Sequence, residues 1–192
     1  MQYRHLFLIA FLFFVFSNDT VAKNYSPDIW GMWQVNKCKS VRTYVLLDQV
    51  VANTLVMKGS KCAIQSGDFL DPYTGKVIPY KDGLDIDHIV PRKWAWDRGA
   101  SRWQQRTRYA FANDLVNLVA VDDSTNRSKG DKPPSKWLPP NTEFHCEYIY
   151  RFDDIVKKYK LKYDPQESVF IKNTLSNKCK GYKYVIPIIN RS

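Results

Sequence analysis

The sequence lacks the marks of three classes of protein: membrane-spanning proteins, repeat proteins and proteins that hold zinc with cysteine thiolates. Its apolar run from Leu6 to Phe16 covers 11 residues, whereas a transmembrane helix needs roughly 18 or more. Internal repeats and low-complexity tracts are absent. Four cysteines are present, but no two stand in a short Cys-x-x-Cys spacing. These absences exclude a repeat architecture and make a thiolate-bound metal unexpected.

The N-terminus is typical of a secretory signal peptide. Arg4 precedes the apolar run, and a polar stretch then ends in the small residues of Thr20-Val21-Ala22. We predict cleavage after Ala22, which makes the protein secreted or periplasmic. A retained membrane anchor is the alternative. The remaining residues, 23–192, have a length that suits a single domain.

The charge of the chain is strongly basic, with a formal net charge of +10. No acidic tail or basic block concentrates this charge, so the folded surface itself must be basic. Such a surface attracts polyanions, which favours a nucleic-acid partner. A protein that adheres to acidic cell envelopes, or one that is merely soluble, would be equally basic.

All four cysteines follow the predicted cleavage site, which predicts two disulfides in an exported protein. Of the three possible pairings we favour Cys38 with Cys62 and Cys146 with Cys179, because each of these closes a local loop. The pattern of apolar residues and turn signals predicts an α+β fold. The predicted elements are helices at 41–56, 101–113, 122–129, 141–161 and from Asp164-Pro165 onward, a hairpin of 62–70 and 76–80 around the turn 71–75, and strands at 83–90 and 115–121. At the start of the last helix, Asp164 can cap and Glu167 can complete a capping box.

Histidine is the usual general base near neutral pH, and the chain after Ala22 contains only two. His88 stands in the segment Asp85-Ile86-Asp87-His88-Ile89-Val90-Pro91, where carboxylates lie beside an imidazole at a strand end. A buried structural histidine is the alternative role. His145, next to Cys146, is expected to be a surface or packing residue.

Asp87 and Asn126 are candidate ligands of a hard divalent ion, because magnesium prefers carboxylate and amide oxygens. Asn126 has an alternative role as a helix cap. A regular strand would point Asp87 and His88 to opposite faces, so a shared site requires the chain to bend there. Pro91 makes such a bend plausible. Asp85 is interpreted as a solvated carboxylate and receives no role.

The stretches DIDHIVP and NLVAVDDSTNRSKGD resemble the HNH nucleases, also called His-Me finger or ββα-metal nucleases. Asn117 and Asn126 stand nine residues apart, as the corresponding residues do in the HNH domains of RNA-guided effector nucleases. The motifs DPYTG, FAND and NRSKGDKPPSKWLP resemble a small exported branch of this group. The nuclease end of modification-dependent restriction enzymes is also similar. The resemblance covers roughly residues 38–150.

The resemblance implies a ββα-metal core at about 83–132, with additional helices and a hairpin stabilised by disulfides. It implies that Asp87 and Asn126 bind one Mg²⁺-like ion and that His88 deprotonates the attacking water. Asn117 would hold the two strands and orient His88. The products would carry 5′-phosphate and 3′-hydroxyl ends. The separation of 29 positions from His88 to Asn117 exceeds that in the minimal HNH module, which affects the expected substrate groove.

The basic residues Arg127 and Lys129 flank Asn126 and are candidates for contacting substrate phosphates. Four tryptophans are expected to fill the core rather than stack on bases: Trp94, Trp96, Trp103 and Trp137. The leading hypothesis is a secreted endonuclease that hydrolyses DNA, or RNA, with little sequence preference. A protective inhibitor protein is a further conceivable partner. The alternatives are a non-catalytic basic nucleic-acid-binding protein and a metal phosphoesterase acting on small substrates.

Overall fold

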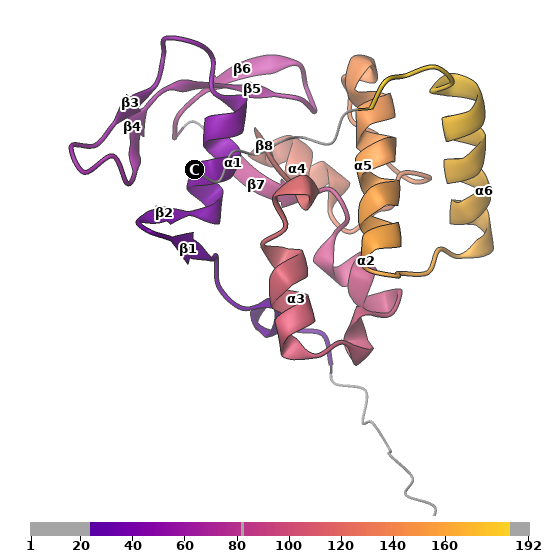
Figure 1. Ribbon diagram of the computed structural model, residues 1–192. Helices are drawn as coiled ribbons and strands as arrows, with labels where there is room; N and C mark the ends of the chain where they lie inside the picture. The colour runs from indigo at the N-terminus through magenta and orange to yellow at the C-terminus, as the bar shows by residue number, and fades with distance from the viewer. Residues whose placement is uncertain (1–23, 82, 185–192) are drawn as a thin grey trace, which may run out of the picture.

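The computed structural model of the protein describes residues 24–81 and 83–184 (Figure 1). Within these residues the chain forms six α-helices and four two-stranded antiparallel sheets. The α+β class is therefore confirmed. The predicted signal peptide, residues 1–22, lies outside the described residues. No helix in the described part of the chain is long and apolar enough to cross a membrane.

The centre of the fold is the antiparallel pair β7 (Leu84–His88) and β8 (Leu118–Asp122), followed directly by α4 (Asp123–Lys129). The first strand pairs with the second along its whole length, from Leu84 opposite Asp122 to His88 opposite Leu118. The Asp122 side chain caps α4 by accepting a 2.7 Å hydrogen bond from Thr125 N. Gly130, at φ 52°, ends the helix. The predicted order of strand, long insertion, strand and helix is confirmed.

The β7–β8 pair lies between two hydrophobic clusters, because successive residues of a strand point to opposite faces. Ile86 and Ala120 face α1 (Val41–Gln49) in the smaller cluster. Val119 and Val121 face the larger cluster, which includes the buried stripe of α5 (His145–Lys158). Figure 1 shows α1 and α5 on opposite sides of the pair. The strands are therefore held rigidly where the site residues emerge.

The N-terminal part contains three further hairpin-like pairs. They are β1 (Val35–Asn36) with β2 (Lys39–Ser40), β3 (Val56–Met57) with β4 (Ile64–Ser66), and β5 (Asp68–Asp71) with β6 (Lys76–Pro79). The predicted turn at 71–75 is confirmed, and it uses Gly75 at φ 72°.

Two predicted boundaries in this part were wrong. The predicted helix 41–56 ends at Gln49, because Val50 pairs with Phe69 and the Val51 N–H donates to Asp68 O. The predicted strand 62–70 is divided between β4 and β5, which pair with different partners. In both places a long-range strand partner outweighs the local apolar spacing.

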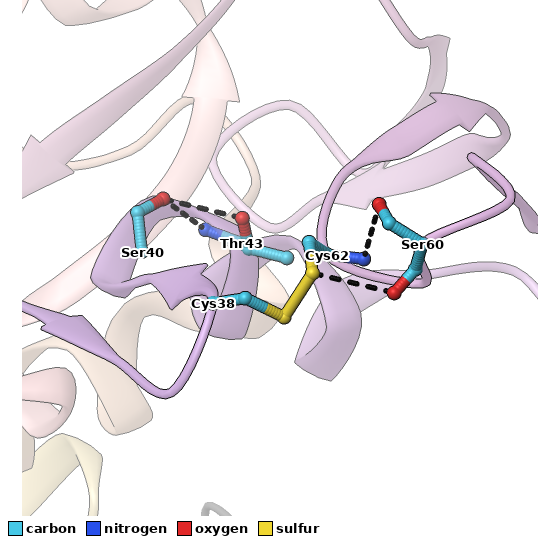
Figure 2. The surroundings of a disulfide bond; sticks show 5 residues. All are labelled: Cys38, Ser40, Thr43, Ser60 and Cys62. Carbon is cyan, nitrogen blue, oxygen red and sulfur yellow. Dashed lines mark hydrogen bonds between the residues drawn. A yellow bond between two sulfur atoms is a disulfide. The ribbon is translucent and has the colours of Figure 1, made fainter.

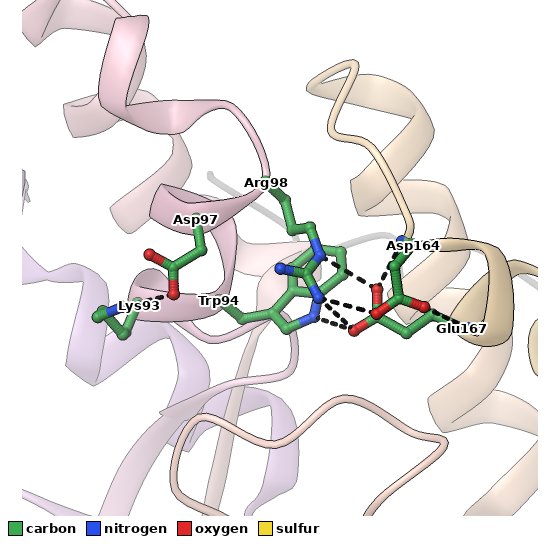
Figure 3. Close-up of polar contacts among 6 residues, drawn as sticks. All are labelled: Lys93, Trp94, Asp97, Arg98, Asp164 and Glu167. Atoms are coloured by element: carbon green, nitrogen blue, oxygen red, sulfur yellow. Dashed lines mark hydrogen bonds and ion pairs between the residues drawn. The ribbon is translucent and has the colours of Figure 1, made fainter. Parts of the chain in front are cut away.

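The other helices are α2 (Arg92–Asp97), α3 (Gln105–Ala112) and α6 (Pro165–Asn173). The helices predicted at 101–113 and 141–161 start later than expected, because a 3-10 turn precedes each of α3 and α5. The predicted capping box at Asp164 and Glu167 is present. Figure 3 shows that it also joins α2 to α6, since Arg98 and Trp94 both donate hydrogen bonds to Glu167.

Both predicted disulfides are confirmed, Cys38–Cys62 and Cys146–Cys179. Figure 2 shows the first, which ties the turn between β1 and β2 to the loop before β4. The second joins the first turn of α5 to the segment that follows α6. Each bond fixes a peripheral segment, at opposite ends of the described chain. Two of the tryptophans expected in the core, Trp94 and Trp96, are buried, and Trp103 and Trp137 pack partly buried against the same cluster.

Candidate active site

The second half of β7 carries the candidate site. Asp85 and Asp87 share the face of the strand that α4 covers, as their contacts with that helix show. His88 points the other way, toward the end of α3. The bend that we expected at this position is absent, because the register with β8 stays regular through His88. The carboxylates and the imidazole therefore flank the strand end from two sides.

Two side-chain contacts, a hydrogen bond and an ion pair, join β7 to α4. Asn126 Nδ2 donates a 2.7 Å hydrogen bond to Asp85 Oδ2. One turn further along the helix, Lys129 Nζ lies 2.8 Å from Asp87 Oδ2 and 3.1 Å from Asp87 Oδ1. Two residues that stand three apart on α4 thus contact two residues that stand two apart on β7. The structure thus joins Asn126 to Asp85 by a hydrogen bond, whereas the sequence analysis grouped Asn126 with Asp87 as ligands of one ion.

The Asp87 carboxylate is buried and accepts hydrogen bonds from two side chains. Besides Lys129, the Tyr73 hydroxyl donates to Asp87 Oδ2 at 2.6 Å. Burial raises the pKa of the Asp87 carboxyl, while Lys129 and Tyr73 act in the opposite direction by favouring its ionised form. Lys129 is completely buried and also donates to the His88 carbonyl at 2.8 Å. This corrects the expectation that Lys129 contacts phosphate, since its ammonium is inside the protein.

The His88 ring is held as a neutral imidazole. Its Nε2 lies 2.9 Å from the Ala112 carbonyl, which can only accept, so we assign the proton to Nε2 and the free lone pair to Nδ1. Burial lowers the pKa of His88 to about 3, with the charge of Arg92 as the next cause. Nδ1 has no hydrogen-bond partner in the described part of the chain, yet it is not one of the buried unpaired atoms there. His88 therefore offers an accessible proton acceptor.

Asn117 is fully buried and fastens the segment after His88 to the start of β8. Its Oδ1 accepts a 2.8 Å hydrogen bond from Val90 N, and its Nδ2 donates to Val90 O at 3.3 Å. Its carbonyl accepts from Ile89 N at 2.8 Å. These three bonds lie one and two residues beyond His88, so Asn117 acts on the backbone and, among the described residues, makes no hydrogen bond to the His88 ring.

The sequence analysis assigned no role to four residues at this site: Asp85, Tyr73, Trp33 and Arg92. The spacing of two between Asp85 and Asp87 was a usable signal, because it places both carboxylates on one face. Tyr73, within the DPYTG motif, and Trp33, which lies over His88, gave no such signal. Arg92 follows Pro91 in the chain, and its charge reaches His88. Arg127, the other candidate phosphate contact, is exposed and ion-paired with Asp123. His145, expected to be a surface or packing residue, is half-buried.

The donor atoms present suit a hard divalent cation in kind. Asp85, Asp87 and Asn126 supply carboxylate and amide oxygens, which is the set that Mg²⁺ prefers. The amide of Asn126 can exchange its nitrogen and oxygen ends by a rotation about its last bond. The Lys129 ammonium is the competing positive charge at Asp87. No group of three or more His, Cys, Asp or Glu side chains that could hold a metal occurs among the described residues.

Comparisons with known proteins agree with these features. Residues 41–169 match the family described as GmrSD restriction endonucleases, C-terminal domain. An uncharacterized secreted protein of Arthroderma benhamiae is 34% identical over 156 residues, which cover 79% of this chain and 74% of that protein. No solved structure matches the chain. Because the match spans β7, β8 and α4 and more than half of the sequence, the chain belongs to the family of GmrSD restriction endonuclease C-terminal domains.

Proposed function

We propose that the protein is an exported, metal-dependent endonuclease whose β7, β8 and α4 form an HNH ββα-metal core. The observation that carries this proposal is the arrangement of side chains at the end of β7. There a neutral imidazole with a free Nδ1 adjoins a strand whose carboxylates face the helix that carries Asn126. The family match supports a nuclease. Two disulfides and a secreted relative support an exported protein, and cleavage after Ala22 is part of the proposal.

In this proposal His88 is the general base and accepts the proton of the attacking water at Nδ1. The Ala112 carbonyl keeps the proton on Nε2, so the reactive nitrogen is always the same one. Asp87 and Asn126 are the proposed cation ligands, and Asp85 joins them through its contact with Asn126. Because β7 stays regular, these ligands lie on the α4 face and the His88 ring on the other, so the attacking water would have to lie beyond the strand end, between the two faces. A bound Mg²⁺ would supply positive charge to the scissile phosphate and to the leaving oxygen.

The proposed substrate is DNA or RNA, cleaved with little sequence preference. A net charge of +10 attracts the phosphate backbone without reading bases. Arg92, beside His88, and the exposed Arg127 are the proposed phosphate contacts. Lys129 instead acts as a positioning residue, because it holds both Asp87 and the His88 carbonyl.

The experiment that tests this function is a plasmid assay with the mature chain, residues 23–192. Degradation with Mg²⁺ that stops with EDTA, and products with 5′-phosphate ends, would support a metal-dependent endonuclease. Circular plasmid as substrate distinguishes an endonuclease from an exonuclease, since it has no ends. A duplex plasmid, a circular single-stranded DNA and an RNA that all stay intact with Mg²⁺, Mn²⁺ and Ca²⁺ alike would rule the proposal out.

A second candidate function is nucleic-acid binding without catalysis. The buried ion pair of Asp87 with Lys129 favours it, because the ammonium already neutralises the carboxylate that the cation needs. Salt-sensitive DNA binding by a chain that cleaves nothing with any of the three metals would support this candidate.

A further inference from the structure

An exposed aromatic ring lies directly beside the proposed base. Trp33 is 39% exposed, and its ring is nearly parallel to the His88 imidazole, at an angle of 9° and a centroid distance of 5.9 Å. Phe111 lies parallel to His88 as well, but it is fully buried. Of the two aromatic neighbours of His88, Trp33 is thus the one whose ring surface a ligand can reach.

The segment that carries Trp33 is anchored by a buried amide. Asn113, 6% exposed, accepts a 2.6 Å hydrogen bond from Gln34 N and donates to Met32 O at 3.3 Å. Gly31, at φ 78°, lets the chain turn into this segment, and a Cβ there would lie 3.0 Å from the Tyr109 ring. The position of Trp33 is therefore fixed by the fold.

The same end of α3 fixes both the base and the tryptophan. Ala112 accepts the hydrogen bond from His88, and the next residue, Asn113, holds the backbone on both sides of Trp33. Two neighbouring positions thus set the distance between the imidazole and the indole. The side chain before Trp33, Met32, is 86% exposed and adds apolar surface at the same place.

A nucleotide combines the two chemistries found here, a phosphate and a flat aromatic base. The Arg92 charge that acts on His88 suits the phosphate, and an uncharged indole suits a base. Stacking does not depend on the identity of the base, because every base has a π-face. Inside a duplex both faces of each base are already stacked on neighbours. An aromatic side chain therefore gains most from a strand whose bases are free.

We infer that Trp33 stacks on a nucleobase next to the scissile phosphodiester, so that the substrate class is single-stranded nucleic acid or locally unpaired duplex. The inference rests on the proposed function, because it places the scissile phosphate at His88. Trp33 contributes to substrate affinity, and His88 contributes to the chemical step.

Binding in EDTA tests the inference without any cleavage. Fluorescence anisotropy would compare a labelled single-stranded DNA with the same strand lacking its bases. The wild-type protein should bind the strand with bases about tenfold more tightly. Trp33→Ala should remove this preference and leave the affinity for the abasic strand unchanged, while Trp33→Phe should keep most of it. Tyr182→Ala, which alters another exposed aromatic residue at 40% exposure, is the matched control.

Cleavage kinetics separate a stacking role from a structural one. Trp33→Ala should raise KM for single strands with little change in kcat. Equal affinity of the wild-type protein for both strands, or a loss in Trp33→Ala confined to kcat, would overturn the inference. Base-dependent binding without cleavage would refute the nuclease and keep Trp33 as a base-binding residue. Cleavage with base-independent binding would refute only the stacking.

Discussion

The Lys129 ammonium lies 2.8 Å from the Asp87 carboxylate and has no exposure to solvent. A buried pair of this kind contributes little net stability, but removal of one partner leaves an uncompensated charge. The pair joins α4 to β7 at the residue that we propose as a metal ligand. Its loss therefore affects both the free energy of unfolding and the geometry at His88, whose carbonyl Lys129 also holds.

Lys129→Met should lower the free energy of unfolding by about 3–5 kcal/mol, because it leaves the buried Asp87 carboxylate without a counter-charge. Arg127→Met, which breaks a solvent-exposed pair on the same helix, should leave the free energy of unfolding nearly unchanged. Urea denaturation measures both. The double variant Asp87→Asn with Lys129→Met should recover most of the lost free energy of unfolding. This result would distinguish the effect of an unpaired buried charge from the effect of lost packing. A cost for Lys129→Met as small as that for Arg127→Met would contradict the buried pair.

The contact of Asn126 with Asp85 predicts a metal site that includes both residues. Calorimetry with Mn²⁺ should show binding to the wild-type protein that weakens at least about tenfold in Asp85→Asn and in Asn126→Ala. Asp123→Asn is the matched control, because it changes a carboxylate of α4 that pairs only with Arg127 among the described side chains. Unchanged Mn²⁺ affinity in Asp85→Asn would return Asp85 to the role of a solvated carboxylate.

The lowered pKa of His88 predicts how stability depends on pH. Because the pKa falls from 6.5 to about 3 on folding, the unfolded chain binds a proton that the folded chain does not. Stability should therefore be highest above pH 6.5 and fall toward pH 3, by up to about 1.4 kcal/mol per pH unit from this group. Urea denaturation in EDTA at several pH values should show this slope reduced in His88→Gln.

His145→Gln is the control for this measurement, since His145 also bonds a backbone carbonyl through Nε2 but is only half-buried, whereas His88 is buried. The same dependence on pH in wild-type protein and His88→Gln would show that His88 titrates normally in the folded state. Arg92→Gln should raise the pKa of His88, because it removes the second cause of the shift.

Asn117→Ala should destabilise the protein by about 1–3 kcal/mol, because it leaves the buried Val90 N–H without a partner. It should also reduce kcat, since the backbone after His88 loses its attachment to β8. Asn173→Ala, at an exposed position on α6, should change neither quantity. Full activity in Asn117→Ala would show that Asn117 supports stability alone.

Much of this architecture could be predicted because it follows from local signals. The turn around Gly75, the capping box at Asp164 and the strand–insertion–strand–helix order each depend on neighbouring residues. The disulfides followed from the same logic, since each closes a local loop. His88 and Asn117 were identified through the same short motifs.

The contacts that determine the site could not be predicted, because they join distant segments. Whether α4 turns Asn126 toward Asp85 or toward Asp87 depends on how the helix docks, which no local pattern encodes. Lys129 was interpreted as a phosphate contact because it flanks Asn126, and only its burial and its pairing with Asp87, far away in the chain, reverse that. Trp33 reaches His88 through an anchor at Asn113, which is 79 residues from Gln34 in the chain.

The most direct test of catalysis at His88 is single-turnover cleavage of a labelled DNA strand at saturating Mg²⁺. His88→Ala should lower the rate by about 10²–10⁴-fold, the usual contribution of a general base. His145→Ala, the matched histidine control, should cleave within about twofold of the wild-type rate, since this half-buried side chain takes no part in the proposed chemistry. A wild-type rate in His88→Ala, or cleavage that persists in EDTA, would contradict a metal-dependent nuclease with His88 as its base.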